Sequence, residues 1–135
     1  MNILERYHAM EYGPAPEARN EADAWLAGCD FSKALFIDGA WKAAAGGKIF
    51  ETSEPSSGKL LAKVSDAGAA DIDAAVTAAA KALPKWSASS GYARAKILYA
   101  IGRAMQRHQR LFAVLESIDN GKPIRESRDI DVPLA

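Results

Sequence analysis

The single cysteine of the chain, Cys29, is the first residue to consider for covalent chemistry. A cysteine nucleophile needs a base within hydrogen-bond reach and an electropositive setting that lowers the pKa of its thiol. The two histidines, His8 and His108, lie far from Cys29 along the chain, and the neighbouring residues supply no base. Cysteine also packs as a small apolar side chain. We therefore interpret Cys29 as a packing residue at the end of a short helix, and we predict no catalytic residue in this chain.

Glu116 and Asp119 are candidates for a carboxylate pair, since a spacing of three puts both on one face of a helix. Such a pair could act in general acid–base catalysis. Lys122 and Arg125 follow closely, and a solvated helix face with balanced charges explains the same pattern. We predict the solvated face.

Gly46, Gly47 and Lys48 come nearest to a phosphate-binding loop. That loop needs a glycine where Lys42 stands and a serine or threonine where Ile49 stands. The segment is therefore predicted to be a hairpin connection, and no residue is predicted to bind a nucleotide cofactor.

The composition is that of an ordinary globular protein. The 135 residues are 49% hydrophobic and 25% charged, and 17 basic side chains balance 17 acidic ones. A balanced charge gives no positive surface for nucleic acid or for an anionic membrane. The first residues lack the layout of a signal peptide, and no apolar run reaches the roughly 20 residues of a membrane-spanning helix. We expect a cytoplasmic protein with no nucleic-acid or membrane partner.

Residues 1–33 predict a helical lead-in. Two short helices are expected, at 2–10 and 17–28, because Pro14 and Pro16 remove two amide donors between them and prevent one continuous helix.

Two β-hairpins are predicted after the lead-in. Asp38-Gly39 accepts the positive φ angles of a tight turn and separates two short apolar segments. Residues 54–58, which contain a proline and a glycine, predict the turn between antiparallel strands at 48–53 and 59–65.

An amphipathic helix follows the hairpins and is predicted to end at Pro84 and Trp86. Its apolar stripe consists of Ile72, Val76, Ala79 and Leu83. An apolar stripe of this kind normally packs against a sheet or another helix. The two hairpins are small, so we expect the stripe to lack a partner within this chain.

Two further helices are predicted at 92–107 and 109–119. Gly121 predicts a left-handed cap after the second, and Pro123 suits the first turn of a fourth helix. Residues 130–135 stay largely apolar without a glycine cap. We therefore expect a truncated reading frame or the amino-terminal piece of a longer protein.

Several segments resemble aldehyde dehydrogenases in order and spacing. They are Phe36-Ile37-Asp38-Gly39-Ala40-Trp41, Glu54-Pro55-Ser56-Ser57-Gly58, Leu83-Pro84-Lys85-Trp86 and Leu115-Glu116-Ser117-Ile118-Asp119-Asn120-Gly121-Lys122-Pro123. Glu54 stands where the family usually has asparagine. The resemblance covers residues 34–135, and the lead-in is similar to that of the family-sixteen aldehyde dehydrogenases, some of which are non-catalytic.

The resemblance implies the fold class. It predicts an α+β fragment, with β-hairpins followed by amphipathic helices, that forms the N-terminal portion of an α/β, Rossmann-like aldehyde dehydrogenase coenzyme domain. Residues 1–33 are then the lead-in, and residues 34–135 are the N-terminal part of a truncated coenzyme-binding domain.

The resemblance also implies an activity for the parent protein, the oxidation of aldehydes to carboxylic acids with NAD or NADP. In the family a cysteine thiolate attacks the aldehyde, and a glutamate activates water. These groups and the nucleotide-binding turn would lie beyond Ala135. The 135 residues alone are expected to be inactive and to bind no coenzyme. The expected partners are the remainder of the parent chain, an aldehyde substrate and further copies in a homo-oligomer.

A structural site for a monovalent cation is implied as well. The resemblance places Thr52 and Asp131 at matching positions, where they would contribute partly through backbone oxygens.

Two other functions stay open. The parent could be a non-catalytic aldehyde-dehydrogenase-like scaffold or protein-interaction module, or the chain could be a free-standing small α+β binding domain.

Overall fold

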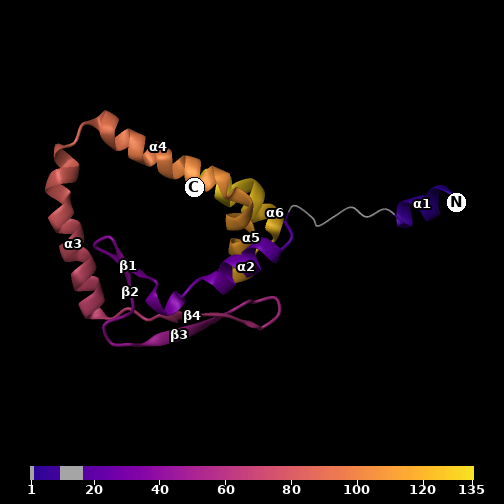
Figure 1. The fold of residues 1–135 in the computed structure, drawn as a ribbon, viewed down its shortest axis with the longest axis horizontal. Coiled ribbons are helices and arrows are strands. Elements are labelled where there is room, and N and C mark those ends of the chain that lie inside the picture. The colour runs from indigo at the N-terminus through magenta and orange to yellow at the C-terminus, as the bar shows by residue number, and fades with distance from the viewer. Residues whose placement is uncertain (1, 10–16) are drawn as a thin grey trace.

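The computed structural model describes residues 2–9 and 17–135. Its main elements, labelled in Figure 1, are α1 (Ile3–His8), α2 (Asn20–Gly28), the 3-10 turn η1 (Phe31–Lys33), β1 (Leu35–Ile37), β2 (Ala40–Lys42), β3 (Ile49–Ser53), β4 (Leu60–Ser65), α3 (Ala69–Ala88), α4 (Gly91–Arg107), α5 (Gln109–Asn120), α6 (Ile124–Glu126), the π-helical segment η2 (Ser127–Asp131) and α7 (Val132–Leu134). The predicted order of hairpins followed by helices is confirmed.

The lead-in contains the two predicted helices, α1 and α2. The break predicted at Pro14 and Pro16 lies outside the described residues. Helix α2 begins at Asn20, later than the predicted residue 17, and its N-cap residue, Arg19, makes no capping hydrogen bond through its side chain. Beyond it, η1 is tied to β4 by the Ser65 hydroxyl, which donates to the carbonyl of Ser32 at 2.7 Å.

The first hairpin has the predicted turn. Asp38 and Gly39 have φ angles of 53° and 76°, as a two-residue turn with left-handed positions requires. Strands β1 and β2 pair antiparallel with Phe36 opposite Trp41, and the two rings lie 5.0 Å apart between centroids.

The second hairpin pairs β3 with β4 through the predicted turn at residues 54–58. Gly58 has a φ angle of 68°, so glycine suits this position of the turn. The interpretation of Gly46 and Gly47 as a hairpin connection was wrong. They join β2 to β3, which belong to two separate two-stranded sheets, because β2 pairs back onto β1 and β3 pairs onward with β4.

Helix α3 is anchored at its start by a buried carboxylate. Asp71 accepts hydrogen bonds from the backbone amides of Gly68 and Ala45, both at 2.9 Å, and thereby fixes the helix to the β2–β3 connection. The predicted end at Pro84 and Trp86 was wrong, since α3 continues to Ala88. Proline costs the helix only one hydrogen bond near its end, and the remaining turn stays in place.

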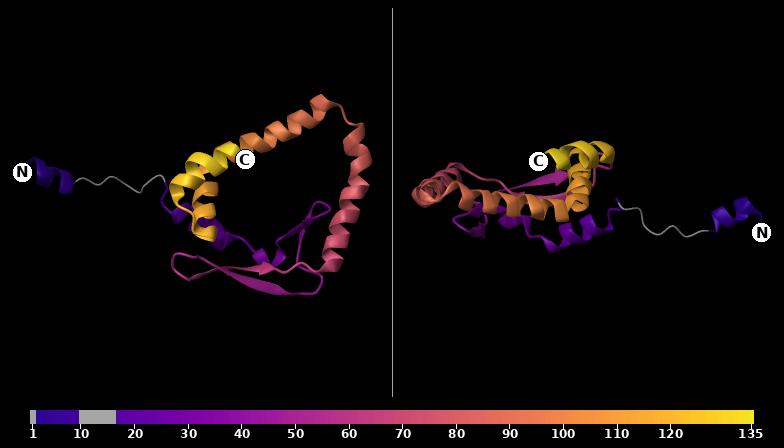
Figure 2. Two further views of the ribbon diagram at one scale, coloured as in Figure 1. Left: turned by 180° about the vertical axis from the view of Figure 1, so that it is seen from behind. Right: turned by 90° about the horizontal axis from the view of Figure 1, so that it is seen from above.

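Helices α3 and α4 together form an arch that leaves the hairpins and returns to α5 (Figures 1 and 2). Ser90 is the N-cap of α4, and its hydroxyl oxygen accepts a hydrogen bond from the backbone amide of Ala93 at 3.2 Å. Only Ser89 and Ser90 connect α3 to α4.

Gly121 ends α5 in the left-handed conformation, with a φ angle of 76°, as predicted. The fourth helix begins after Pro123 and runs through α6, η2 and α7. Its π-helical middle was not predicted. There Ser127 is fully buried and shares a hydrogen bond of 3.3 Å with the hydroxyl of Ser117 on α5.

The core is small and lies where α2, α5, α6 and β4 meet. Ala22, Val114 and Ile118 are buried there, and Leu61, Leu111, Leu115 and Ile124 pack around them. The arch contributes little to it: Ile72, Val76 and Leu83 of the predicted stripe are 56%, 62% and 59% exposed. The chain exposes 10238 Å² in all, whereas a compact monomer of 14.4 kDa exposes about 6,800 Å². The apolar face of the arch therefore has no partner within the described chain.

None of the helices in residues 2–9 and 17–135 combines the length and the apolar character that crossing a bilayer requires.

Candidate functional site

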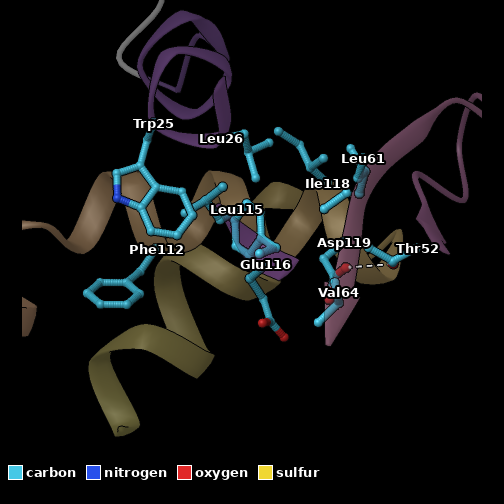
Figure 3. A pocket seen from close by; sticks show the side chains of 12 residues that line it. Trp25, Leu26, Thr52, Leu61, Val64, Phe112, Leu115, Glu116, Ile118 and Asp119 are labelled. Atoms are coloured by element: carbon cyan, nitrogen blue, oxygen red, sulfur yellow. Dashed lines mark hydrogen bonds between the residues drawn. The ribbon is translucent and has the colours of Figure 1, made fainter. Parts of the chain in front are cut away.

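A pocket, here called the central pocket, is an open space of about 310 Å³ between α2, the second hairpin and α5 (Figure 3). It is lined by Trp25, Leu26, Phe31, Thr52, Leu61, Ala62, Val64, Phe112, Leu115, Glu116, Ile118 and Asp119. Its walls are mostly apolar, because the core-facing sides of α2 and α5 meet the inner face of β4 there. The pocket adjoins the small core described above.

Glu116 and Asp119, the candidate carboxylate pair, lie at the polar end of the central pocket. Thr52 donates through its hydroxyl to Asp119 at 3.3 Å, which joins β3 to α5 (Figure 3). Glu116 accepts from the side-chain amide of Asn120 at 2.6 Å. Both carboxylates therefore have hydrogen-bond donors. The residues that line the pocket include the Thr52 hydroxyl but no histidine, lysine or cysteine beside the pair.

Thr52 and Asp131, the predicted cation ligands, have different partners in the structure. Thr52 faces Asp119, while Asp131 forms an ion pair with Lys122. The hydrogen bond from Lys122 to Asp131 raises the pKa of the lysine, so the lysine stays charged and neutralises the carboxylate. The assignment of Thr52 and Asp131 to one cation stays a prediction. The contact between Thr52 and Asp119, 67 residues apart, was not predicted, since no local pattern signals it.

Cys29 lies at the end of α2, as predicted, and is neither buried nor fully exposed. A second open pocket of about 400 Å³ includes it with Trp25, Asp30, Phe31, Lys33 and Trp41. Lys33 is paired with Asp30 at 3.0 Å, and neither histidine lines this pocket. Asp30, the carboxylate that lines this pocket, is thus held in an ion pair, and no histidine stands beside Cys29 to activate its thiol.

A coenzyme does not fit the part of the chain that the structure describes. Dinucleotides bind where a glycine-rich turn leads from a parallel strand into a helix. The described strands form only antiparallel pairs, and Gly46-Gly47 leads from one strand into another. Residues 2–9 and 17–135 also contain no group of three His, Cys, Asp or Glu side chains placed to hold a metal ion.

Glu54 is buried in the turn of the second hairpin. Hydrogen bonds from the hydroxyls of Ser57 and Ser56, at 2.8 and 3.0 Å, and the nearby Arg19 hold the pKa of Glu54 below its ordinary value. The carboxylate is therefore kept charged.

A family model described as "Aldehyde dehydrogenase family" matches residues 41–135, which is more than half of the chain. The chain belongs to the aldehyde dehydrogenase family. Acetaldehyde dehydrogenase 2 of Cupriavidus necator is 45% identical to this aldehyde dehydrogenase chain over 100 residues, which are 74% of the chain and 20% of the relative.

Solved structures agree in fold. An aldehyde dehydrogenase from Bacillus cereus superposes with a TM-score of 0.76 and 35% identity over 92% of the chain and 24% of that structure. The indole-3-acetaldehyde dehydrogenase of P. syringae, solved with NAD+ and IAA, superposes with a TM-score of 0.75 and 32% identity. The match covers 85% of this chain and 24% of that structure. The chain thus matches the N-terminal portion of these enzymes and spans about a fifth of the length of the curated relatives. The closer resemblance to the family-sixteen subgroup stays a prediction.

Proposed function

We propose that this chain is the amino-terminal part of an NAD- or NADP-dependent aldehyde dehydrogenase that oxidises aldehydes to carboxylic acids. The family match over residues 41–135 carries this proposal. Its physical support is the division of the chain into a small core and an arch whose apolar side chains lack a partner.

Within such an enzyme, the role of this chain is structural. The coenzyme would accept a hydride from the substrate, and the described residues provide neither its binding turn nor an unpaired base beside Cys29. The chain instead supplies helices α3 and α4, whose apolar faces pack against another layer of the same domain. Residues 1–33 serve as the lead-in, and residues 34–135 form the first part of that domain.

The exposed apolar stripe specifies what that layer must be. Ile72, Val76 and Leu83 repeat at helical spacing on α3, and Ile97 and Ile101 do the same on α4. Large apolar groups forfeit about 1.5–3 kcal/mol each when they stay in water. A broad apolar surface, such as one face of a sheet, is the layer that would cover both helices.

The proposal extends to partners and compartment. We propose the cytoplasm as the compartment, since a single cysteine leaves no disulfide within this chain. We propose an aldehyde as the substrate, since the chemistry of the family requires one. We also propose that the protein forms a homo-oligomer.

The test measures NADH or NADPH formation at 340 nm with a panel of aldehydes. The protein that contains this chain should form the reduced coenzyme, and the 135 residues alone should not. Coenzyme reduction by the 135-residue chain would contradict the structural role. A containing protein that folds but reduces no coenzyme with any aldehyde would overturn the enzymatic proposal and favour a scaffold.

A further inference from the structure

The amino-terminal end of α2 is fixed by two ion pairs that reach different parts of the fold. Arg19 donates to Glu54 in the turn of the second hairpin at 3.1 Å. Just ahead of it, Glu17 accepts from Arg128 in the π-helical segment, also at 3.1 Å. The start of α2 supplies the cation of one pair and the anion of the other. A shift of α2 along its axis would therefore separate both pairs.

The anchor on the hairpin side is rigid. Glu54 is only 7% exposed, and Ser56 and Ser57 fix the orientation of its carboxylate. The turn itself is close-packed on the end of α5, because a Cβ built on Gly121 would lie 3.0 Å from Pro55. Arg19 is half exposed and also bonds to Asp23 on its own helix. The movable partner of this pair is therefore α2.

Apolar packing holds α2 only weakly. Ala22 is its one buried residue among those described, and Trp25 is 44% exposed. At the other end, the chain turns into extended backbone at Cys29, after which η1 is tied to β4 through Ser65. The helix is thus locked at its start, tethered at its end and lightly packed between.

Helix α2 is also one wall of the central pocket. Trp25 and Leu26 project from it toward Leu115 and Ile118 of α5 (Figure 3). If α2 swings away about Cys29, the apolar surface of α5 and β4 becomes accessible.

We propose that α2 is a strap over the central pocket, locked by the Arg19–Glu54 and Glu17–Arg128 pairs, and that breaking these locks opens the pocket without unfolding the hairpins. The strap rests on contacts that are independent of the catalytic proposal, because none of them involves a coenzyme or a nucleophile.

Hydrogen exchange of the protein that contains this chain tests the strap. The variants are Glu54→Gln, Arg128→Gln and the double variant, with Glu51→Gln as the control because Glu51 forms an exposed pair with Lys63 between β3 and β4. In each single variant, Glu54→Gln or Arg128→Gln, the amides of residues 20–28 should exchange roughly threefold to tenfold faster than in the unchanged protein. In the double variant their exchange should be faster than in either single variant. Amides of β3 and β4 should keep their rates, as should all segments in the control.

A second measurement needs no change at the locks. Acrylamide quenching of Trp25 in the protein that contains this chain, with its other tryptophans, Trp41 and Trp86 among them, replaced by phenylalanine, should increase at 1 M salt, where the screening length falls to about 3 Å. Unchanged exchange of residues 20–28 in the double variant would overturn the strap. Equal acceleration across α2, β3, β4 and α5 would overturn it too, since that result means global unfolding.

Discussion

Gly121 shows how one residue joins two elements. Its φ angle of 76° is left-handed, and a Cβ there would meet Pro55 at 3.0 Å. Gly121→Ala should destabilise the fold by about 1–2 kcal/mol from the backbone conformation alone, and further through the contact with Pro55. Gly47→Ala is the matched control, because Gly47 has a φ angle of 64° but open space around it.

Urea denaturation of the protein that contains this chain measures the difference. The midpoint for Gly121→Ala should be lower than that for Gly47→Ala. Equal midpoints would mean that the packing of the 54–58 turn on α5 contributes nothing to stability.

Glu54 predicts a pH dependence whose sign follows from its lowered pKa. A carboxylate with a lowered pKa contributes stability above the ordinary value of about 4.3, and loses that contribution as the pH falls through the lowered value. Glu54→Gln removes this proton-linked contribution. The stability of the unchanged protein should therefore fall more steeply below about pH 5 than that of Glu54→Gln. Parallel pH curves in thermal unfolding, with Glu51→Gln as control, would contradict the account.

At the scale of elements, the arch offers a matched pair of neighbouring sites on α3. Val76 lies on the apolar stripe and is 62% exposed, while Thr77 is exposed on the other side. Val76→Lys should leave the helix content of the 135-residue chain unchanged. In the protein that contains the chain it should lower the melting temperature by several degrees, because it would bury a charge. Thr77→Lys should have little effect in either.

The comparison uses circular dichroism and thermal unfolding of both variants in both proteins. Equal melting temperatures for the two lysine variants in the longer protein would show that the stripe stays in water there.

Local signals explain which elements could be predicted from the sequence. Asp38-Gly39, the 54–58 turn and Gly121 carry their own backbone preferences, so the hairpins and the end of α5 were predicted correctly. The end of α3 was predicted too early because a proline normally ends a helix. In the structure α3 contains Pro84 and tolerates the loss of one hydrogen bond. The contacts of the pocket and the strap join residues such as Arg19 and Glu54, 35 positions apart, and only the folded chain brings them together.

At the scale of the whole molecule, exposed apolar surface predicts the behaviour of the isolated chain. Twenty large hydrophobic residues are exposed in the described chain, among them Ile72, Ile97 and Ile101. Patches of this kind mark interaction surfaces or cause aggregation. The 135-residue chain should therefore self-associate or show poor solubility. Sedimentation velocity checks this, and a single monomeric species at micromolar concentration would count against it.

The central claim is that α3 and α4 are covered by another layer in the protein to which this chain belongs. Hydrogen exchange of residues 69–107 tests it most directly, because the same amides can be followed in the 135-residue chain and in the longer protein. The account predicts that exchange in this segment slows by at least tenfold in the longer protein. Equal exchange rates in the two proteins would show that the arch is complete without a partner and would contradict the account.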